Sequence, residues 1–161
     1  MGVQDVRVTE ASGLEELYRS EGPVMWRSLL AATGDPALAE DALSEAFAQA
    51  LARGDEVRDP SRWIWRAAFR IAAGELKQRR TRTELGDLED SYEFPEPLVH
   101  VFDALERLSP NQRLAVVLHD YADRPVSEVA ATLGVTPATV YVHLSQGRRR
   151  LRSLLEDEDD A

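Results

Sequence analysis

The sequence has no cysteine among its 161 residues, which excludes a disulfide framework and a thiolate metal site. Its three histidines, His100, His119 and His143, lie far apart along the chain, so no metal site is predicted. Neither a Gly-rich phosphate loop nor a nucleophile–base arrangement stands out. We therefore predict a protein that is not an enzyme, that needs no metal or cofactor, and that works in a reducing, cytoplasmic setting.

Long apolar runs are also missing. No apolar window approaches the roughly 20 residues that span a bilayer, and the amino terminus has no cationic patch followed by an apolar segment. Alternating apolar and polar runs, which are typical of strands, are absent too. The content of hydrophobic residues is nevertheless 43%, enough for a core, and the dominant pattern has helical periodicity. These features predict an all-α protein without membrane insertion.

The formal net charge is −10, but the acidic residues are unevenly distributed. Eight acidic and no basic residues lie between Glu84 and Glu106, and five more acidic residues lie between Glu156 and Asp160. The remaining residues carry a net charge of +3, and within them the basic residues cluster. The negative net charge of the chain therefore comes from the two acidic segments, and the rest of the chain has a positive net charge.

Start and stop signals divide the chain into helices. One helix is predicted from Gly13 to Glu21 and a second from Pro23 to Ala32, before Thr33 and Gly34. Asp-Pro pairs at residues 35–36 and 59–60, a cap followed by proline, predict the starts of two more. We expect a first domain over residues 10–82, an acidic linker over 83–98, a second helical domain over 99–155 and an acidic tail over 156–161.

The stretch VSEVAATLGVTPATVYVHLSQGRRRL, Val126 to Leu151, predicts a helix-turn-helix. Gly134 lies at the turn, Thr136 can cap the second helix, and both helices carry an apolar stripe. The outward face of the second helix suits base edges at its start and phosphates toward its end. That face comprises Ala138, Thr139, Tyr141, Val142, His143, Gln146, Arg148 and Arg149. The alternative is a pair of packed helices with a solvated basic end.

The segment RWIWRAAFRIAAGELKQRRTR interleaves aromatic and basic side chains. Aromatic faces stack on unpaired bases while cations follow the backbone, so this composition suits single-stranded nucleic acid. The alternative is a core helix with a charged, solvated face, and for Trp63 or Trp65 alone core packing is an equal explanation.

With these segments the chain resembles the bacterial extracytoplasmic-function (ECF) sigma factors of the sigma-seventy class. The resemblance covers residues 12–82 and 99–153. It depends on LYRSEGPV, DPALAEDALSEAFAQAL and RDPSRWIWRAAFRIA in the first domain, and on ALERLSPNQRLAVVLHDY and the helix-turn-helix in the second. It implies a region 2-like domain followed by a region 4-like domain. The chain departs from the family pattern at Arg70, Gly74, Tyr141 and His143.

The resemblance implies a transcription initiation factor that binds core RNA polymerase and directs it to specific promoters. The helix-turn-helix would read the upstream (−35) element as duplex DNA, and the first domain would capture the melted downstream (−10) element. The implied polymerase-binding residues are Glu40, Asp41, Ser44 and Glu45, and the implied melted-promoter residues are Trp63, Arg66, Arg70, Lys77 and Arg80. An anti-sigma factor is an implied further partner.

Two other functions remain open at this point. The chain could be a helix-turn-helix regulator that acts without recruiting polymerase, although the basic and aromatic segment disfavours this. It could also be a sigma-like interaction protein that has lost promoter reading.

Overall fold

The computed structural model describes residues 2–84 and 96–159, and within these ranges it describes all side chains except those of residues 3–7, 79–84, 96–97 and 158–159. The regular structure of these ranges is entirely helical, which confirms the predicted all-α class. The first unit contains α1 (Val3–Thr33), α2 (Pro36–Arg53), the 3-10 helix η1 (Gly54–Glu56) and α3 (Pro60–Glu84). The second contains α4 (Glu96–Glu106), α5 (Pro110–Ala115), the π-helix η2 (Val116–Tyr121), α6 (Val126–Leu133) and α7 (Pro137–Asp159). Most of the predicted linker, residues 85–95, lies outside the described residues, as do residues 160–161.

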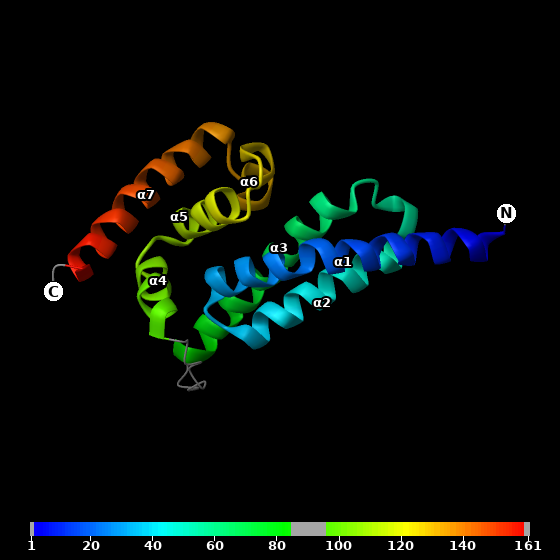
Figure 1. Ribbon diagram of the computed structural model, residues 1–161, viewed down its shortest axis with the longest axis horizontal. Coiled ribbons are helices and arrows are strands. Elements are labelled where there is room, and N and C mark those ends of the chain that lie inside the picture. The colour runs from blue at the N-terminus through cyan, green and yellow to red at the C-terminus, as the bar shows by residue number, and fades with distance from the viewer. Residues whose placement is uncertain (1, 85–95, 160–161) are drawn as a thin grey trace.

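α1 is a single helix of 31 residues that contains Pro23 in its interior, so the prediction of two helices separated before this proline is wrong. A proline inside a helix removes a backbone hydrogen bond and costs about 3 kcal/mol. Tertiary packing offsets that cost, because α1 packs along α2 and α3 and its Met25 and Leu29 side chains are completely buried. Figure 1 shows the amino-terminal end of α1 extending beyond α2 and α3.

The predicted starts of α2 and α3 are confirmed by their caps. The Asp35 side chain accepts a hydrogen bond of 3.1 Å from the Leu38 backbone N–H, and Asp59 Oδ1 accepts one of 3.2 Å from the Arg62 backbone N–H. Each cap satisfies a donor that the first helical turn would otherwise leave unpaired. These caps fix where the two helices begin and therefore which of their faces turn inward.

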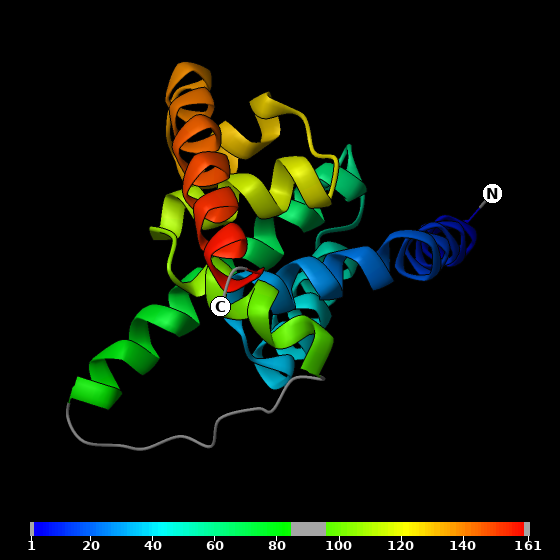
Figure 2. The same cartoon turned by 60° about the vertical axis from the view of Figure 1, so that its left-hand side comes forward.

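Buried side chains from both units form one continuous hydrophobic cluster. Leu38, Leu43 and Ile64 fill the space between α1, α2 and α3, and burying each contributes about 1.5–3 kcal/mol. The cluster continues into the second unit, where Val129 and Val140 are fully buried. η2 contacts α1 and α6 contacts α3, so the second unit lies directly on the first (Figures 1 and 2).

The helix-turn-helix forms as predicted from α6 and α7. Gly134 at the turn has a φ of 68°, which a side chain would disfavour, and Thr136 Oγ1 accepts a hydrogen bond of 3.2 Å from the Thr139 backbone N–H. α6 has no such cap, because Pro125 occupies the N-cap position and offers no side-chain acceptor. The apolar stripe of α7 faces inward, with Val140, Leu144 and Gly147 buried.

At Gly147, α7 lies close to the helices beneath it. A Cβ atom at this position would lie 3.0 Å from Val116 Cγ2 and 3.4 Å from both Cβ and the carbonyl oxygen of Gln112. The absence of a side chain therefore lets α7 sit close to α5 and η2. This contact determines how closely α7 packs against the rest of its unit.

Candidate nucleic-acid interface

The first half of α7 presents an outward face that is partly exposed. Tyr141 is 61% exposed and Val142 is 51% exposed, although both are large hydrophobic side chains. Ala138 is also exposed, whereas Thr139 and His143 are half-buried and Thr139 Oγ1 lies 2.9 Å from Thr136 Oγ1. Exposed apolar and hydroxyl groups at the capped start of a helix suit contact with base edges and thymine methyl groups.

The second half of α7 is basic, and its arginines differ in their surroundings. The Arg148 guanidinium donates hydrogen bonds of 2.8 Å and 2.6 Å to the two carboxylate oxygens of Asp120, and these bonds raise the pKa of Arg148 above its ordinary value. Arg149 is exposed and has no side-chain partner among the described residues. Arg150 donates to the Arg107 carbonyl oxygen at 3.0 Å. Of the predicted DNA-contacting pair Arg148 and Arg149, only the second is therefore a freely available cation.

The Gln146 side chain also has a hydrogen-bond partner on a neighbouring helix. Its side-chain oxygen accepts a hydrogen bond of 3.3 Å from Gln112 Nε2 on α5. Sequence reasoning missed both Gln112 and Asp120 as partners of α7, since each is about thirty residues distant and no local spacing connects them. The pairs hold the middle of α7 against α5 and η2.

The basic and aromatic segment, residues 62–82, forms most of α3, and the structure divides its described side chains into two sets. Arg66, Arg70 and Lys77 are exposed, and Trp63 is half-buried with the Arg53 guanidinium 5.5 Å from its ring. The Arg80 side chain lies outside the described residues. Trp65 and Phe69 are only 3% and 2% exposed and stack on each other with ring centroids 6.2 Å apart. Core packing therefore explains these two aromatic residues.

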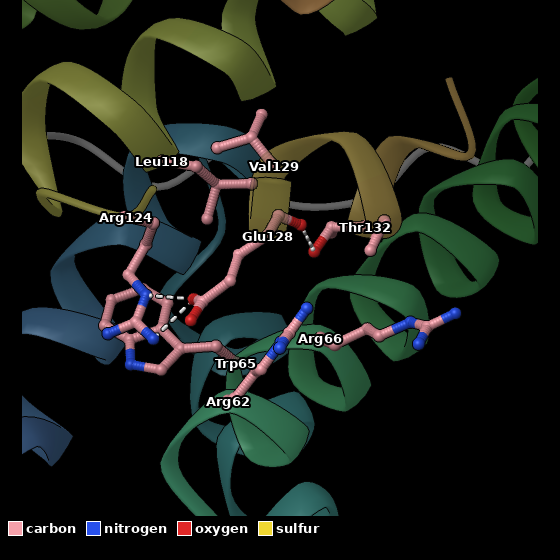
Figure 3. Close-up of a pocket in the computed structure, with 9 residues that line it drawn as sticks. Arg62, Trp65, Arg66, Leu118, Arg124, Glu128, Val129 and Thr132 are labelled. Atoms are coloured by element: carbon pink, nitrogen blue, oxygen red, sulfur yellow. Dashed lines mark hydrogen bonds and ion pairs between the residues drawn. The ribbon is translucent and has the colours of Figure 1, made fainter. Parts of the chain in front are cut away.

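A polar cluster surrounds the Trp65 ring where the two units meet, and we name it the Arg124 cluster. Figure 3 shows three of its members, Trp65, Arg124 and Glu128. It consists of Glu21 on α1, Trp65 on α3, Arg124 in the turn before α6, and Glu128 on α6. The Arg124 guanidinium lies 5.0 Å from the Trp65 ring centroid, and its Nε donates to Glu128 at 2.8 Å. Only the pairing of Arg124 with Glu128, four residues later on a helix, has a sequence signal.

The acidic face of α2 is fully exposed. Glu40, Asp41, Ser44 and Glu45 are all exposed, and their spacing places them on one side of the helix. Asp41, Ser44 and Glu45 also line a surface groove of about 600 Å³ between α2 and α3, to which Ile71 contributes. This side of the first unit offers carboxylates around a groove of mixed polar and apolar lining.

Comparison with known proteins decides the family. A family model described as "Sigma-70, region 4" matches residues 101–151. An RNA polymerase sigma-E factor of Streptomyces avermitilis is 30% identical, over 93% of this chain and 89% of its own length. The chain belongs to the ECF RNA polymerase sigma factors.

Two further comparisons agree with this assignment. The ECF RNA polymerase sigma factor SigL of Mycobacterium tuberculosis is 27% identical over 96% of both chains. The sigma factor RpoE of Bartonella quintana, solved in complex with the anti-sigma factor NepR, superimposes with a TM-score of 0.77 at 20% identity, covering 88% of this chain and 96% of that one. At this identity the likeness shows a shared fold.

As a family member, this sigma factor acts in transcription initiation together with RNA polymerase. The described residues contain no group of three or more His, Cys, Asp or Glu side chains that could hold a metal ion. Across residues 2–84 and 96–159, no helix combines the length and apolar character that crossing a bilayer requires.

Proposed function

We propose that this sigma factor binds core RNA polymerase and directs it to promoters by reading a duplex upstream (−35) element with α7 and a melted downstream (−10) element with α3. The observation that carries this proposal is the division of α7 into an exposed, capped start and a basic end. Tyr141 and Val142 are adjacent and each more than half exposed, so they form an apolar patch beside the capped start of the helix.

Within α7, each half has a separate role. Thr139, Tyr141 and Val142, with Ala138 and His143 beside them, contact base edges and determine which element is preferred. Gln146, Arg148 and Arg149 fix the helix on the duplex, the arginines through phosphates. Because Asp120 already neutralises Arg148, Arg149 supplies the larger share of the phosphate attraction.

On α3, the melted strand lies along the exposed cations Arg66, Arg70 and Lys77 and continues toward Arg80. These side chains recur every three to seven residues along one helix, as a cationic track for a nucleic-acid backbone requires. Trp63, whose ring is half-buried, presents its open side as the stacking surface for an unpaired base.

The polymerase contact is the acidic face of α2, formed by Glu40, Asp41, Ser44 and Glu45. Exposed carboxylates around this groove fit a basic helical partner, because complementary charge steers the encounter. Residues 10–82 then serve as the region 2-like domain, 83–98 as its linker and 99–155 as the region 4-like domain with its acidic tail. An anti-sigma factor controls this chain, as the solved complex of the related fold suggests.

Run-off transcription from genomic fragments, with core polymerase and with or without the protein, tests the proposal. We expect transcripts from a subset of fragments only when the protein is present. Asp41→Ala should reduce polymerase binding, whereas Asp55→Ala, which removes an exposed carboxylate from η1 in the same unit, should not. Tight operator binding without polymerase would favour a simple helix-turn-helix regulator. Polymerase binding without any transcript would favour an interaction protein.

A further inference from the structure

Hydrogen bonds beneath α7 determine which end of the Gln146 amide faces outward. α5 and α7 pack side by side (Figures 1 and 2). Gln112, half-buried on α5, bonds to the cap of its own helix with one end of its side chain and to the exposed Gln146 with the other. The orientation of one amide is thereby passed on to the next.

The chain of bonds begins at the capping box of α5. The Ser109 hydroxyl accepts a hydrogen bond of 3.3 Å from the Gln112 backbone N–H, and the Ser109 backbone N–H donates one of 3.3 Å to Gln112 Oε1. A backbone N–H can only donate, so Gln112 must turn its side-chain oxygen toward Ser109. Its amide nitrogen is therefore left for α7.

That nitrogen determines the orientation of Gln146. Gln112 Nε2 donates to Gln146 Oε1 at 3.3 Å. An amide nitrogen can only donate, so Gln146 must turn its oxygen toward Gln112. Gln146 Nε2, with two N–H donors, has no hydrogen-bond partner among the described residues and belongs to an exposed side chain. A glutamine without such a partner can present either end of its amide to a ligand, and Gln146 has lost that choice.

Arg148, two residues further along α7, offers the same polarity. Its Nε and Nη2 atoms donate to the Asp120 carboxylate, and the guanidinium has no acceptor of its own. At both positions where α5 or η2 bonds to an exposed side chain of α7, the groups left for a ligand are thus donors. A ligand of this part of α7 must present acceptors.

This polarity restricts which bases Gln146 can read. In the major groove guanine offers the acceptors N7 and O6 and thymine the acceptor O4, whereas cytosine offers a donor at N4. Adenine offers both an acceptor and a donor, and an unrestrained glutamine satisfies both with its two ends. With its oxygen bound to Gln112, Gln146 cannot complete that pair. Phosphate oxygens are acceptors as well and are compatible with the outward N–H groups.

We propose that Gln112 is a positioning residue that makes Gln146 a donor-only contact to the upstream element, where it meets an acceptor of guanine or thymine or a phosphate oxygen. This inference rests on the proposed function for its ligand, whereas the orientation of the two amides is a property of the free protein. Gln112 acts through Gln146 alone.

Gln112→Glu reverses the orientation and keeps the capping box. A carboxylate at this position still accepts from the Ser109 backbone N–H, because glutamate is as suited to the box as glutamine. Its second oxygen accepts where the amide nitrogen donated, so Gln146 must turn its nitrogen inward and its oxygen outward. The outward group then prefers a donor such as cytosine N4.

Selection from duplexes randomised over the upstream element, with core polymerase and each variant, measures this preference by sequencing. At one position, Gln112→Glu should lower the ratio of guanine or thymine to cytosine by about fivefold or more. Asn111→Glu is the matched control, because it adds the same charge to α5 at a side chain that makes no hydrogen bond to α7 among the described residues. It should leave the ratio unchanged.

A phosphate contact gives a different result from a base contact. In that case Gln112→Glu should weaken binding to all duplexes alike, by more than Asn111→Glu does. In either case Gln112→Glu should have no further effect when Gln146 is already alanine, whereas a purely structural role of Gln112 would persist in that background. Gln146→Glu, at an exposed position, also presents an outward acceptor and should reproduce the effect of Gln112→Glu without touching the capping box.

Two results would overturn the inference alone. One is a Gln112→Glu variant that matches Asn111→Glu in both affinity and base preference while the parent protein selects an upstream sequence. The other is an effect of Gln112→Glu that persists without the Gln146 amide. A parent protein whose polymerase selects no upstream sequence would overturn the proposed function, and this inference with it.

Discussion

Two glycines inside helices, Gly74 on α3 and Gly147 on α7, should respond in opposite directions to the same substitution by alanine. In a helix interior alanine is more favourable than glycine by about 1 kcal/mol. A Cβ atom at Gly74 would have no heavy atom within 4 Å, whereas at Gly147 it would lie 3.0 Å from Val116 Cγ2. Gly74→Ala should therefore stabilise the protein by about 1 kcal/mol.

The gain in helix propensity is common to both substitutions, so their difference isolates the packing cost at Gly147. Forcing a methyl group into a filled site costs about 1–3 kcal/mol. Only the distance to Val116 Cγ2 is short, since the two distances of 3.4 Å to Gln112 are ordinary van der Waals contacts, and Val116 is 7% exposed and has little room to move. Gly147→Ala should thus be less stable than Gly74→Ala by about 1–3 kcal/mol, and neutral to destabilised relative to the parent.

Urea unfolding followed by far-ultraviolet circular dichroism measures both values. A thermal scan should show a separation of about 2–4 °C for each kcal/mol in a protein of this size. Val116→Ala provides a coupling control, because trimming the nearest atom should cost less in the Gly147→Ala background than in the parent. Equal stabilisation by the two glycine substitutions would refute the close approach of α7 to η2.

Three further predictions concern the proposed interfaces. Arg149→Ala should weaken binding to all promoter duplexes alike and flatten the dependence on salt by about one unit, with a smaller effect for Arg148→Ala because Asp120 already pairs with Arg148. Fluorescence anisotropy over a salt series measures this, and equal slopes for the two variants would contradict it. Tyr141→Ala should change the preferred upstream element by about 1–3 kcal/mol in competition assays, and a uniform loss would argue against base reading. Trp63→Ala should reduce open-complex formation beyond what its measured loss of thermal stability explains, and a defect due to unfolding alone would eliminate the stacking role.

Local sequence signals predicted most of the fold because they are satisfied within a few residues. The caps at Asp35, Asp59 and Thr136 appear where the sequence placed them, since each needs only a side chain and the next turn of backbone. The helix-turn-helix was predictable for the same reason. Pro23 was misread because its penalty is local but the packing that offsets it comes from α2 and α3.

The contacts between the two units could not be predicted from the sequence. Arg124 and Glu21 lie on opposite sides of the predicted linker, and no local spacing connects them. For Trp65 the sequence left base stacking and core packing equally open, and its 3% exposure, beside Phe69 and Arg124 of the other unit, decides for packing. Composition indicates which side chains are suited to bind a ligand. Whether those side chains are buried depends on which other helices pack against them.

Under the proposed base-reading role, the exposed start of α7 bears on how promoter preference can diverge within such a family. Tyr141 and Val142 contribute little to the core, and surface substitutions of this kind usually change stability by no more than about 0.5 kcal/mol. Selection can therefore exchange these side chains for new targets without a compensating change elsewhere in the fold. Val140 and Leu144, their buried neighbours on the same helix, have no such freedom. One helix thus combines an evolvable outer face with an inner face constrained by packing.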